Sequence, residues 1–110
     1  VTHVDDVVQA WIAAVEAPRE DVVGEKFQVS YGQENSIIRL AHICYEVTGR
    51  EPLIEMRPYR PGEYGQRELF NNNKARRVLG YNPKIDPVSG IAKTWAWAQD
   101  ELIHEAYAAR

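Results

Sequence analysis

The segment Arg60-Pro61-Gly62-Glu63 holds the two side chains best suited to binding chemistry in this sequence. An arginine guanidinium stays charged at any working pH and donates hydrogen bonds in a planar fork that matches phosphate oxygens. A carboxylate three residues further on can accept hydrogen bonds from two neighbouring hydroxyl groups of a ribose. Because proline and glycine favour a tight turn, they hold Arg60 and Glu63 at its two sides. The segment indicates a nucleotide-binding turn, and an ion pair between Arg60 and Glu63 is the open alternative.

The stretch from residue 57 to residue 77 is basic within an acidic chain. The whole sequence has a formal net charge of −3, whereas this stretch carries +4 and the remainder −7. Its charged residues are Arg57, Arg60, Arg67, Lys74, Arg76 and Arg77, with Glu63 and Glu68. A local excess of positive charge favours a confined anion site over a broad polyanion surface, which argues against nucleic acid as a partner. Ordinary solvated charges on loops and helices would give the same pattern.

The sequence shows no other kind of reactive site. No serine or cysteine lies in a glycine-rich elbow, no tyrosine is followed by a lysine four residues later, and no glycine-rich phosphate loop occurs. His42 and Glu46 are one helical turn apart, a spacing more typical of a surface hydrogen bond than of half a metal site. Asp5 and Asp6 open a helix and are expected to cap it. The sequence therefore predicts neither a catalytic residue nor a metal ligand in this chain.

Helices dominate the elements that must position this turn. Apolar spacing and capping residues predict four helices, at about residues 5–17, 36–48, 74–79 and 88–106. Gly49 is expected to end the second helix in the left-handed conformation, and Gly80 closes the third. Cys44 lies on the apolar stripe of the second helix, so we expect a small core residue there.

Short strands are predicted where apolar residues alternate or where prolines bound an apolar run. These stretches are residues 26–31 and 53–57, with a brief extended piece at 68–70. The predicted fold class is α+β, mixed and helix-dominated, with about four helices and two or three short strands. Strands this few and short do not form a stable sheet of their own, so we expect them to need packing against further structure.

Size and composition are those of one ordinary globular domain. The chain has 110 residues, of which 45% are hydrophobic and 26% charged. The single cysteine excludes an internal disulfide and fits a reducing, cytoplasmic compartment. The longest apolar run, Ala10–Val15, is far shorter than the roughly 20 residues of a membrane span, and no secretory leader opens the sequence.

Five segments in order carry a family resemblance. They are residues 1–8 (VTHVDDVV), 24–29 (GEKFQV), 60–63 (RPGE), 73–83 (NKARRVLGYNP) and 90–97 (GIAKTWAW). This order resembles the C-terminal third of the extended short-chain dehydrogenases/reductases, the family of NAD-dependent nucleotide-sugar epimerases and dehydratases that includes UDP-galactose 4-epimerase. The resemblance covers essentially the whole chain. It implies that residues 1–110 form the substrate-binding C-terminal domain, without the N-terminal Rossmann domain that holds NAD and the catalytic tyrosine and lysine.

The resemblance also assigns roles to residues and partners. Arg60 would contact the diphosphate of a nucleotide-sugar such as a UDP-sugar, Glu63 the ribose hydroxyls, and Arg67 the sugar or the second phosphate. The segment 3–6 and the stretch near residues 27–29 would pack against the Rossmann domain. The chain alone would be inactive, and the family leaves epimerisation, dehydration and decarboxylation open. A non-enzymatic oligomerising or interaction module, using exposed apolar faces at the first helix and Trp97, is the alternative function.

The chain departs from the family pattern at the turn and before the third helix. Glu63 stands where aspartate is common, and its extra methylene implies a shifted ribose or a different nucleotide. Asn71 and Asn73 replace the usual aspartate and serine before the lysine–alanine pair, and Asn73 is expected to cap the helix.

Overall fold

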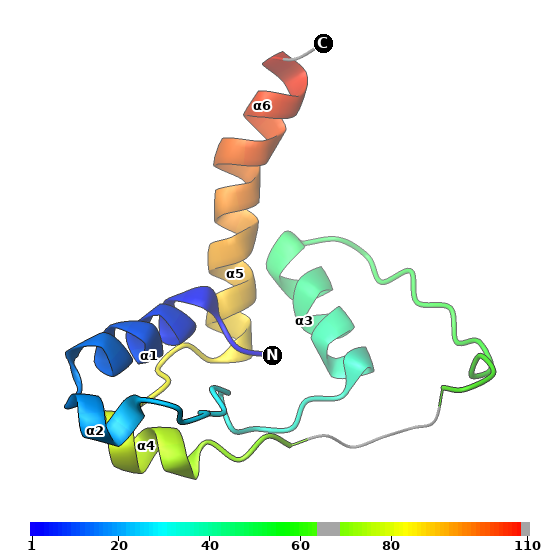
Figure 1. Ribbon diagram of the computed structural model, residues 1–110. Coiled ribbons are helices and arrows are strands. Elements are labelled where there is room, and N and C mark those ends of the chain that lie inside the picture. Colours follow the sequence, from blue (N-terminus) through cyan, green and yellow to red (C-terminus); the bar gives the residue numbers. More distant parts are fainter. Residues whose placement is uncertain (64–68, 109–110) are drawn as a thin grey trace. The chain divides into compact units, whose positions relative to one another are not determined.

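The computed structural model describes residues 1–63 and 69–108, apart from the side chains at positions 102, 103, 106 and 107. These residues belong to two compact units. The first unit, Val1–Asn35 with Pro58–Asp86, contains α1 (Val4–Glu16), α2 (Arg19–Val22) and α4 (Asn73–Leu79). The second unit, Ser36–Arg57 with Pro87–Arg110, contains α3 (Ile37–Thr48), α5 (Pro87–Trp97), the π-helical turn η1 (Ala98–Leu102) and α6 (Ile103–Ala108), as Figure 1 shows.

The first unit is built around Ala10, Ala75 and Tyr81, whose side chains are almost fully buried. Ala10 lies on α1 and Ala75 on α4, and these two helices are in contact. Small side chains at the contact allow dense packing between the helices. Phe27 and Val29, which are partly buried, pack against the same cluster. The core of this unit therefore depends on segments that are far apart in the sequence.

Gly80 turns the chain so that Tyr81 enters this core. Its φ of +64° lies in the left-handed region that glycine adopts without strain. The backbone N–H of Tyr81 then donates to the carbonyl of Ala75 at 3.2 Å, which satisfies a carbonyl at the end of α4. The expected closure of this helix at Gly80 is confirmed.

Asp6 is a buried carboxylate on α1, only 3% exposed. Its Oδ1 accepts a hydrogen bond from the backbone N–H of Lys84 at 2.9 Å, and its Oδ2 accepts one from Ile85 at 3.1 Å. Three residues further along α1, the Gln9 side chain accepts from the backbone N–H of Asn82 at 3.1 Å. Helix α1 therefore holds the stretch after Tyr81 through three side-chain acceptors, two of them on one carboxylate.

The prediction that an aspartate caps α1 is wrong. His3 is the N-cap, and its Nδ1 accepts from the backbone N–H of Asp5 at 3.2 Å. The Asp6 carboxylate is used inside the unit instead, because two backbone N–H groups of a distant segment reach it. In α4, Asn73 is the first helical residue rather than the cap, and the Asn71 side chain accepts from its N–H at 2.8 Å.

The predicted strands are also wrong, because no described residue is in a strand. Residues 26–31 and 53–57 are irregular, as are 69 and 70, while residue 68 lies outside the described part. A strand requires a neighbouring strand to complete its hydrogen bonds, and the described part of the chain offers none to residues 26–31. Side chains satisfy part of that backbone instead: the Ser30 carbonyl accepts from Asn72 and Tyr81, and the Tyr31 N–H donates to Thr2.

The second unit is a pair of helices, α3 and α5, packed on each other. Ile43 on α3 is 3% exposed, and Gly90 on α5 is buried. The Ser36 side chain accepts from the N–H of Arg39 at 3.2 Å, and Gly49 ends α3 at a φ of +67°, as expected. From α5 the chain continues through η1 into α6 as one helical column (Figure 1).

Cys44 is exposed, so its predicted core position is wrong. The buried side of α3 is centred on Ile43, with Leu40 and Val47 partly buried at helical spacing. Adjacent helical residues point about 100° apart, so a face centred on Ile43 leaves its neighbour toward solvent. In the described part of the chain, no helix has the length and apolar character of a membrane span.

Candidate functional site

The segment Arg60-Pro61-Gly62-Glu63 forms a hydrogen-bonded turn in the first unit. The backbone N–H of Glu63 donates to the carbonyl of Arg60 at 2.9 Å, and Gly62 has a φ of +88°. Proline at the second position and a left-handed glycine at the third are the pattern of a type II turn. The expected tight turn is confirmed, but its side chains do not lie on opposite sides, because Arg60 and Glu63 meet each other.

The side chains of Arg60 and Glu63 close on each other. Arg60 Nη2 lies 2.9 Å from Glu63 Oε1, and the backbone N–H of Arg60 donates to Glu63 Oε2 at 3.0 Å. The Arg60 side chain is nevertheless 85% exposed, and that of Glu63 is 47% exposed. An exposed ion pair stabilises by only about 0–1 kcal/mol, so a strongly binding anion can displace it. The structure thus contains the ion pair that the sequence left open as an alternative to nucleotide binding.

Arg60 still presents donors that no described residue uses. A guanidinium carries five N–H groups in a planar fork. Among the described residues, only Nη2 of this guanidinium has a hydrogen-bonding partner. The free N–H groups can therefore donate to two oxygens of a phosphate group in the bidentate arrangement that guanidinium favours.

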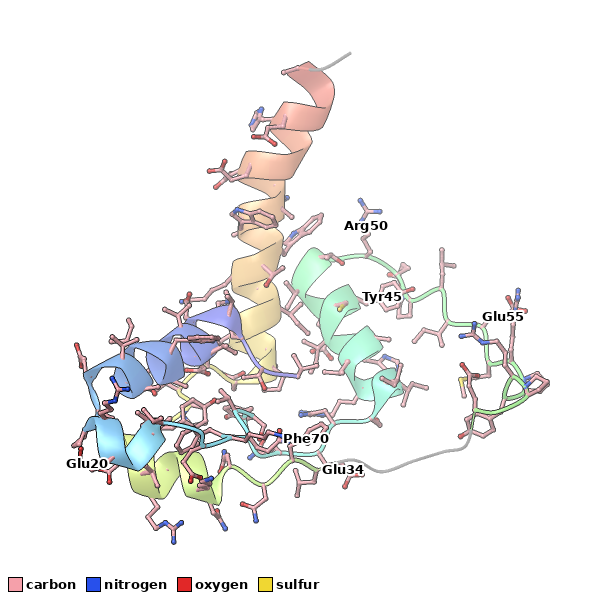
Figure 2. The ribbon with its side chains drawn as sticks, viewed as in Figure 1. Glu20, Glu34, Tyr45, Arg50, Glu55 and Phe70 are labelled. Atoms are coloured by element: carbon pink, nitrogen blue, oxygen red, sulfur yellow. The ribbon has the colours of Figure 1, made fainter. Side chains whose placement is uncertain are left out.

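Two other cations of the basic stretch, Arg57 and Lys74, are paired with carboxylates. Arg57, in the second unit, donates to Glu55 at 2.7 Å, and this bond raises the pKa of the guanidinium. Figure 2 shows Glu55 on the irregular segment that follows α3. In the first unit Lys74 binds Glu25, which lowers the pKa of that carboxyl group. This pairing favours local structural contacts over a general polyanion surface.

Three hollows on the first unit lie away from the turn. The α1 groove, of about 430 Å³, is lined mainly by apolar side chains, among them Trp11, Val15, Phe27, Val29 and Leu79. A second hollow, of about 520 Å³, is bordered by Asn73, Lys74, Arg76 and Arg77, and a third, of about 400 Å³, lies beside residues 28–33 and Phe70. Phe70 is labelled in Figure 2 on the stretch that leads into α4. Neither Arg60 nor Glu63 lines any of the three.

Arg67, the third predicted substrate-binding residue, lies outside the described residues. No three His, Cys, Asp or Glu side chains of the described part lie together as metal ligands. A dinucleotide cofactor is normally cradled between a strand and a helix by a glycine-rich turn. Since residues 1–63 and 69–108 include no strand, they do not provide such a cradle for NAD.

Sequence reasoning missed the roles of Asp6 and of the α1 groove. Asp6 precedes Ala10 by four residues, so the two lie on one face of α1, and both are buried. The four-residue spacing puts the acidic Asp6 on the same helix face as the small Ala10. This placement was the sequence signal that could have indicated an internal contact of Asp6. The large apolar residues lie on the remaining surface of α1, where Trp11 is 70% and Val15 82% exposed.

The curated relatives that match this chain share one enzyme name. A UDP-glucose 4-epimerase of Mycolicibacterium smegmatis is 36% identical over 91 residues, which cover 83% of this chain and 28% of that protein. UDP-glucose 4-epimerases of Halalkalibacterium halodurans and Lacticaseibacillus casei are each 27% identical over 99 residues, 89% of this chain and 29% and 30% of theirs. No family model and no solved structure matches the chain.

These matches confirm the family resemblance predicted from the sequence. The chain is related to the nucleotide-sugar epimerases of the extended short-chain dehydrogenases/reductases, and it resembles their C-terminal portion. The particular relatives are UDP-glucose 4-epimerases. The chain spans less than a third of the length of these curated relatives.

Proposed function

We propose that this chain is the substrate-binding C-terminal portion of an NAD-dependent nucleotide-sugar epimerase or dehydratase, most closely of the UDP-sugar 4-epimerase kind. The observation that carries the proposal is the exposed Arg60 guanidinium, held on a proline–glycine turn with a free donor edge. In a chain related to UDP-glucose 4-epimerases, the ligand that suits this guanidinium is the diphosphate of a UDP-sugar. Glu63 would accept the ribose hydroxyls, and Arg67 would reach the sugar or the second phosphate.

The contribution of this portion is positioning. Binding energy from the nucleotide would hold the sugar against the nicotinamide of NAD, which the rest of the parent protein would bind. That cofactor would supply hydride abstraction and return. Residues 1–110 by themselves would be inactive, and a cytoplasmic location fits their single, exposed cysteine.

The remainder of the parent protein is the proposed partner of the first unit. The relatives are more than three times as long as the stretch they share with this chain, so a large portion has no counterpart here. The α1 groove, whose lining includes the exposed side chains of Trp11 and Val15, forms an apolar surface on the first unit. An apolar surface of this kind usually marks an interaction site. We therefore assign it to the N-terminal Rossmann portion.

A titration of the 110-residue chain with UDP and UDP-glucose tests the nucleotide proposal. Arg60→Ala should weaken binding of both ligands by about tenfold or more, because charge-assisted bidentate contacts to phosphate are lost. Arg57→Ala is the matched control, since Arg57 is also an exposed arginine paired with a nearby glutamate. Equal binding by the wild type and Arg60→Ala, or no binding of UDP at all, contradicts the proposal. In the parent enzyme the same substitution should raise KM for a UDP-sugar.

An association module without enzymatic function is the second candidate. The exposed apolar face of α1 favours it, as does Trp97 on α5, which is 53% exposed. A chain that forms dimers and is indifferent to nucleotides would support this candidate instead.

A further inference from the structure

The hollow beside α4 is lined by side chains that the proposed function does not use. This α4 hollow, of about 520 Å³, is bordered by Asn73, Lys74, Arg76 and Arg77. Three of the four lining residues are cations and none is acidic. The N–H of Asn73 is already bonded to the Asn71 side chain, so the helix backbone is not what the hollow offers. Its chemistry is that of the three cationic side chains, which stand within one helical turn of each other.

Arg76 is held in a fixed orientation at this hollow. Its Nε donates to Asn72 Oδ1 at 2.9 Å, and Asn72 Nδ2 in turn donates to the Ser30 carbonyl at 2.9 Å. Asn72 is only 6% exposed, so the amide that holds the guanidinium is itself fixed in the first unit. Among the described residues, no other nitrogen of this guanidinium has a hydrogen-bonding partner. Arg76 therefore presents its outer N–H groups already oriented, which reduces the entropy lost when a ligand binds.

Arg77 and Lys74 add charge to the same hollow. Arg77 is exposed and has neither a hydrogen bond nor an ion pair with any described residue. Lys74 binds Glu25 and lies 5.0 Å from the centre of the Phe27 ring. The three cations against this one carboxylate leave a net charge of +2. An unpaired guanidinium on the surface is available to a ligand without the loss of an existing contact.

We propose that the α4 hollow is an anion site for a phosphate group, with Arg76 and Arg77 donating to the phosphate oxygens and Lys74 contributing charge. Guanidinium groups match the geometry of phosphate oxygens. A phosphate monoester carries a charge of about −1.5 to −2 at pH 7, which balances the local excess. The site is separate from the Arg60 turn, since Arg60 does not line the hollow. This inference is therefore independent of the proposed function.

An NMR titration of the 110-residue chain at pH 7 and low salt tests the site. The probes are inorganic phosphate and phenyl phosphate, because free phosphate and a phosphate ester share the recognised group. Backbone and side-chain signals of Arg76 and Arg77 should shift with one dissociation constant for each probe. Equal affinities assign recognition to the phosphate group alone, and tighter binding of phenyl phosphate adds contacts to the organic part. If the signals of both arginines stay in place with both probes, the inference is overturned.

Arg77→Gln is the decisive variant, because it removes a guanidinium that touches no other described residue. It should weaken binding of both probes by about two- to fivefold, the range expected for one exposed charge pair. Arg76→Lys keeps the charge but loses the planar fork, so it should weaken binding by a similar factor. Arg50→Gln is the matched control for net charge: Arg50 is an exposed arginine of the second unit, labelled in Figure 2 on the stretch that follows α3. An equal loss in Arg50→Gln would show only the general attraction of exposed cations and would contradict the site.

Arg60→Ala separates the two anion sites. This variant should leave the phosphate-induced shifts of Arg76 and Arg77 unchanged, and their disappearance would overturn the inference. Intact shifts at α4 in a chain that does not bind UDP overturn only the proposed function. Circular dichroism of Arg77→Gln should match that of the wild type, since the side chain is exposed.

Discussion

Tyr81 and Asn72 donate hydrogen bonds to the same backbone carbonyl, that of Ser30. The Tyr81 hydroxyl lies 3.2 Å from this oxygen and the Asn72 Nδ2 lies 2.9 Å from it. Both donors are buried side chains, and both come from the region of α4. The shared carbonyl ties the irregular stretch before Gly32 to the core of the first unit. In a stretch without strand hydrogen bonds, these two side chains fix the path of the backbone.

Alkaline pH should lower the free energy of unfolding of the first unit, because the Tyr81 hydroxyl is a proton donor in the folded chain. Burial raises the pKa of its hydroxyl, the negative charge of Asp6 raises it further, and Arg76 opposes both. The unfolded chain then loses the tyrosine proton near pH 10 while the folded chain keeps it. The contribution of the protonated Tyr81 hydroxyl to the free energy of unfolding is therefore fully present below about pH 10. Above that pH the contribution is lost, by at most about 1.4 kcal/mol per pH unit. Urea unfolding from pH 7 to pH 11 measures this dependence.

Tyr81→Phe is the control for that dependence. The substitution should cost about 0.5–1.5 kcal/mol at neutral pH, since one hydrogen bond is lost while Asn72 still serves the Ser30 carbonyl. It should also flatten the alkaline loss of stability. An equally steep loss in Tyr81→Phe would assign the pH dependence to another group.

Gly32 should tolerate a side chain less well than Gly24. Both have positive φ, +83° and +76°, so alanine is strained at either position. A Cβ at Gly32 would also lie 3.0 Å from Asn72 Nδ2, whereas nothing lies within 4 Å at Gly24. We expect Gly24→Ala to cost about 1–2 kcal/mol, the strain of the left-handed region, and Gly32→Ala to cost more. Thermal unfolding of the two variants side by side provides the measurement, and equal costs would show that the Asn72 side chain yields freely.

Local signals in the sequence predicted α1, α3, α4, the helix that begins near residue 88 and the turn, but not α2 or the π-helical turn η1. The serine cap and glycine end of α3 act through their immediate neighbours, and so does the type II pattern of Pro61 and Gly62. The ion pair between Arg60 and Glu63 also spans only three residues and was one of the two expected alternatives. Interactions between residues that are close together in the sequence can therefore be predicted without knowledge of the fold.

Strands and buried contacts could not be predicted from the local sequence in this way. The alternation in residues 26–31 indicates a half-buried face, and Phe27 and Val29 do pack on the core. Whether such a stretch pairs as a strand depends on a neighbour that local sequence does not specify. The same limit applies to Asp6, whose partners Lys84 and Ile85 are more than 70 residues away, and to Cys44, since the rotation of α3 is decided by its packing on α5.

The buried Asp6 carboxylate should be the most sensitive charged position of the first unit. Asp6→Ala would leave the N–H groups of Lys84 and Ile85 without their acceptor, at about 1–3 kcal/mol for each group that stays buried. Asp5→Ala is the matched control, because Asp5 is the adjacent acidic residue, with a side chain that is 57% exposed. Denaturant unfolding should show a large loss for the first variant and a loss within about 0.5 kcal/mol for the second. Similar losses for both would mean that helix-dipole effects at the start of α1, not the internal hydrogen bonds, account for the role of Asp6.

The apolar face of α1 should make the isolated chain self-associate. Trp11 and Val15 line the α1 groove and are largely exposed, so burial against a partner is favourable. Trp11→Gln should weaken the self-association constant by about tenfold or more, since burial of a large apolar side chain contributes about 1.5–3 kcal/mol. Sedimentation equilibrium over a range of chain concentrations measures this change. Trp97→Gln is the control in the second unit: a larger effect there would move the association surface to α5. A chain that stays monomeric at all concentrations would remove the support for an association module and leave the α1 face to the N-terminal portion alone.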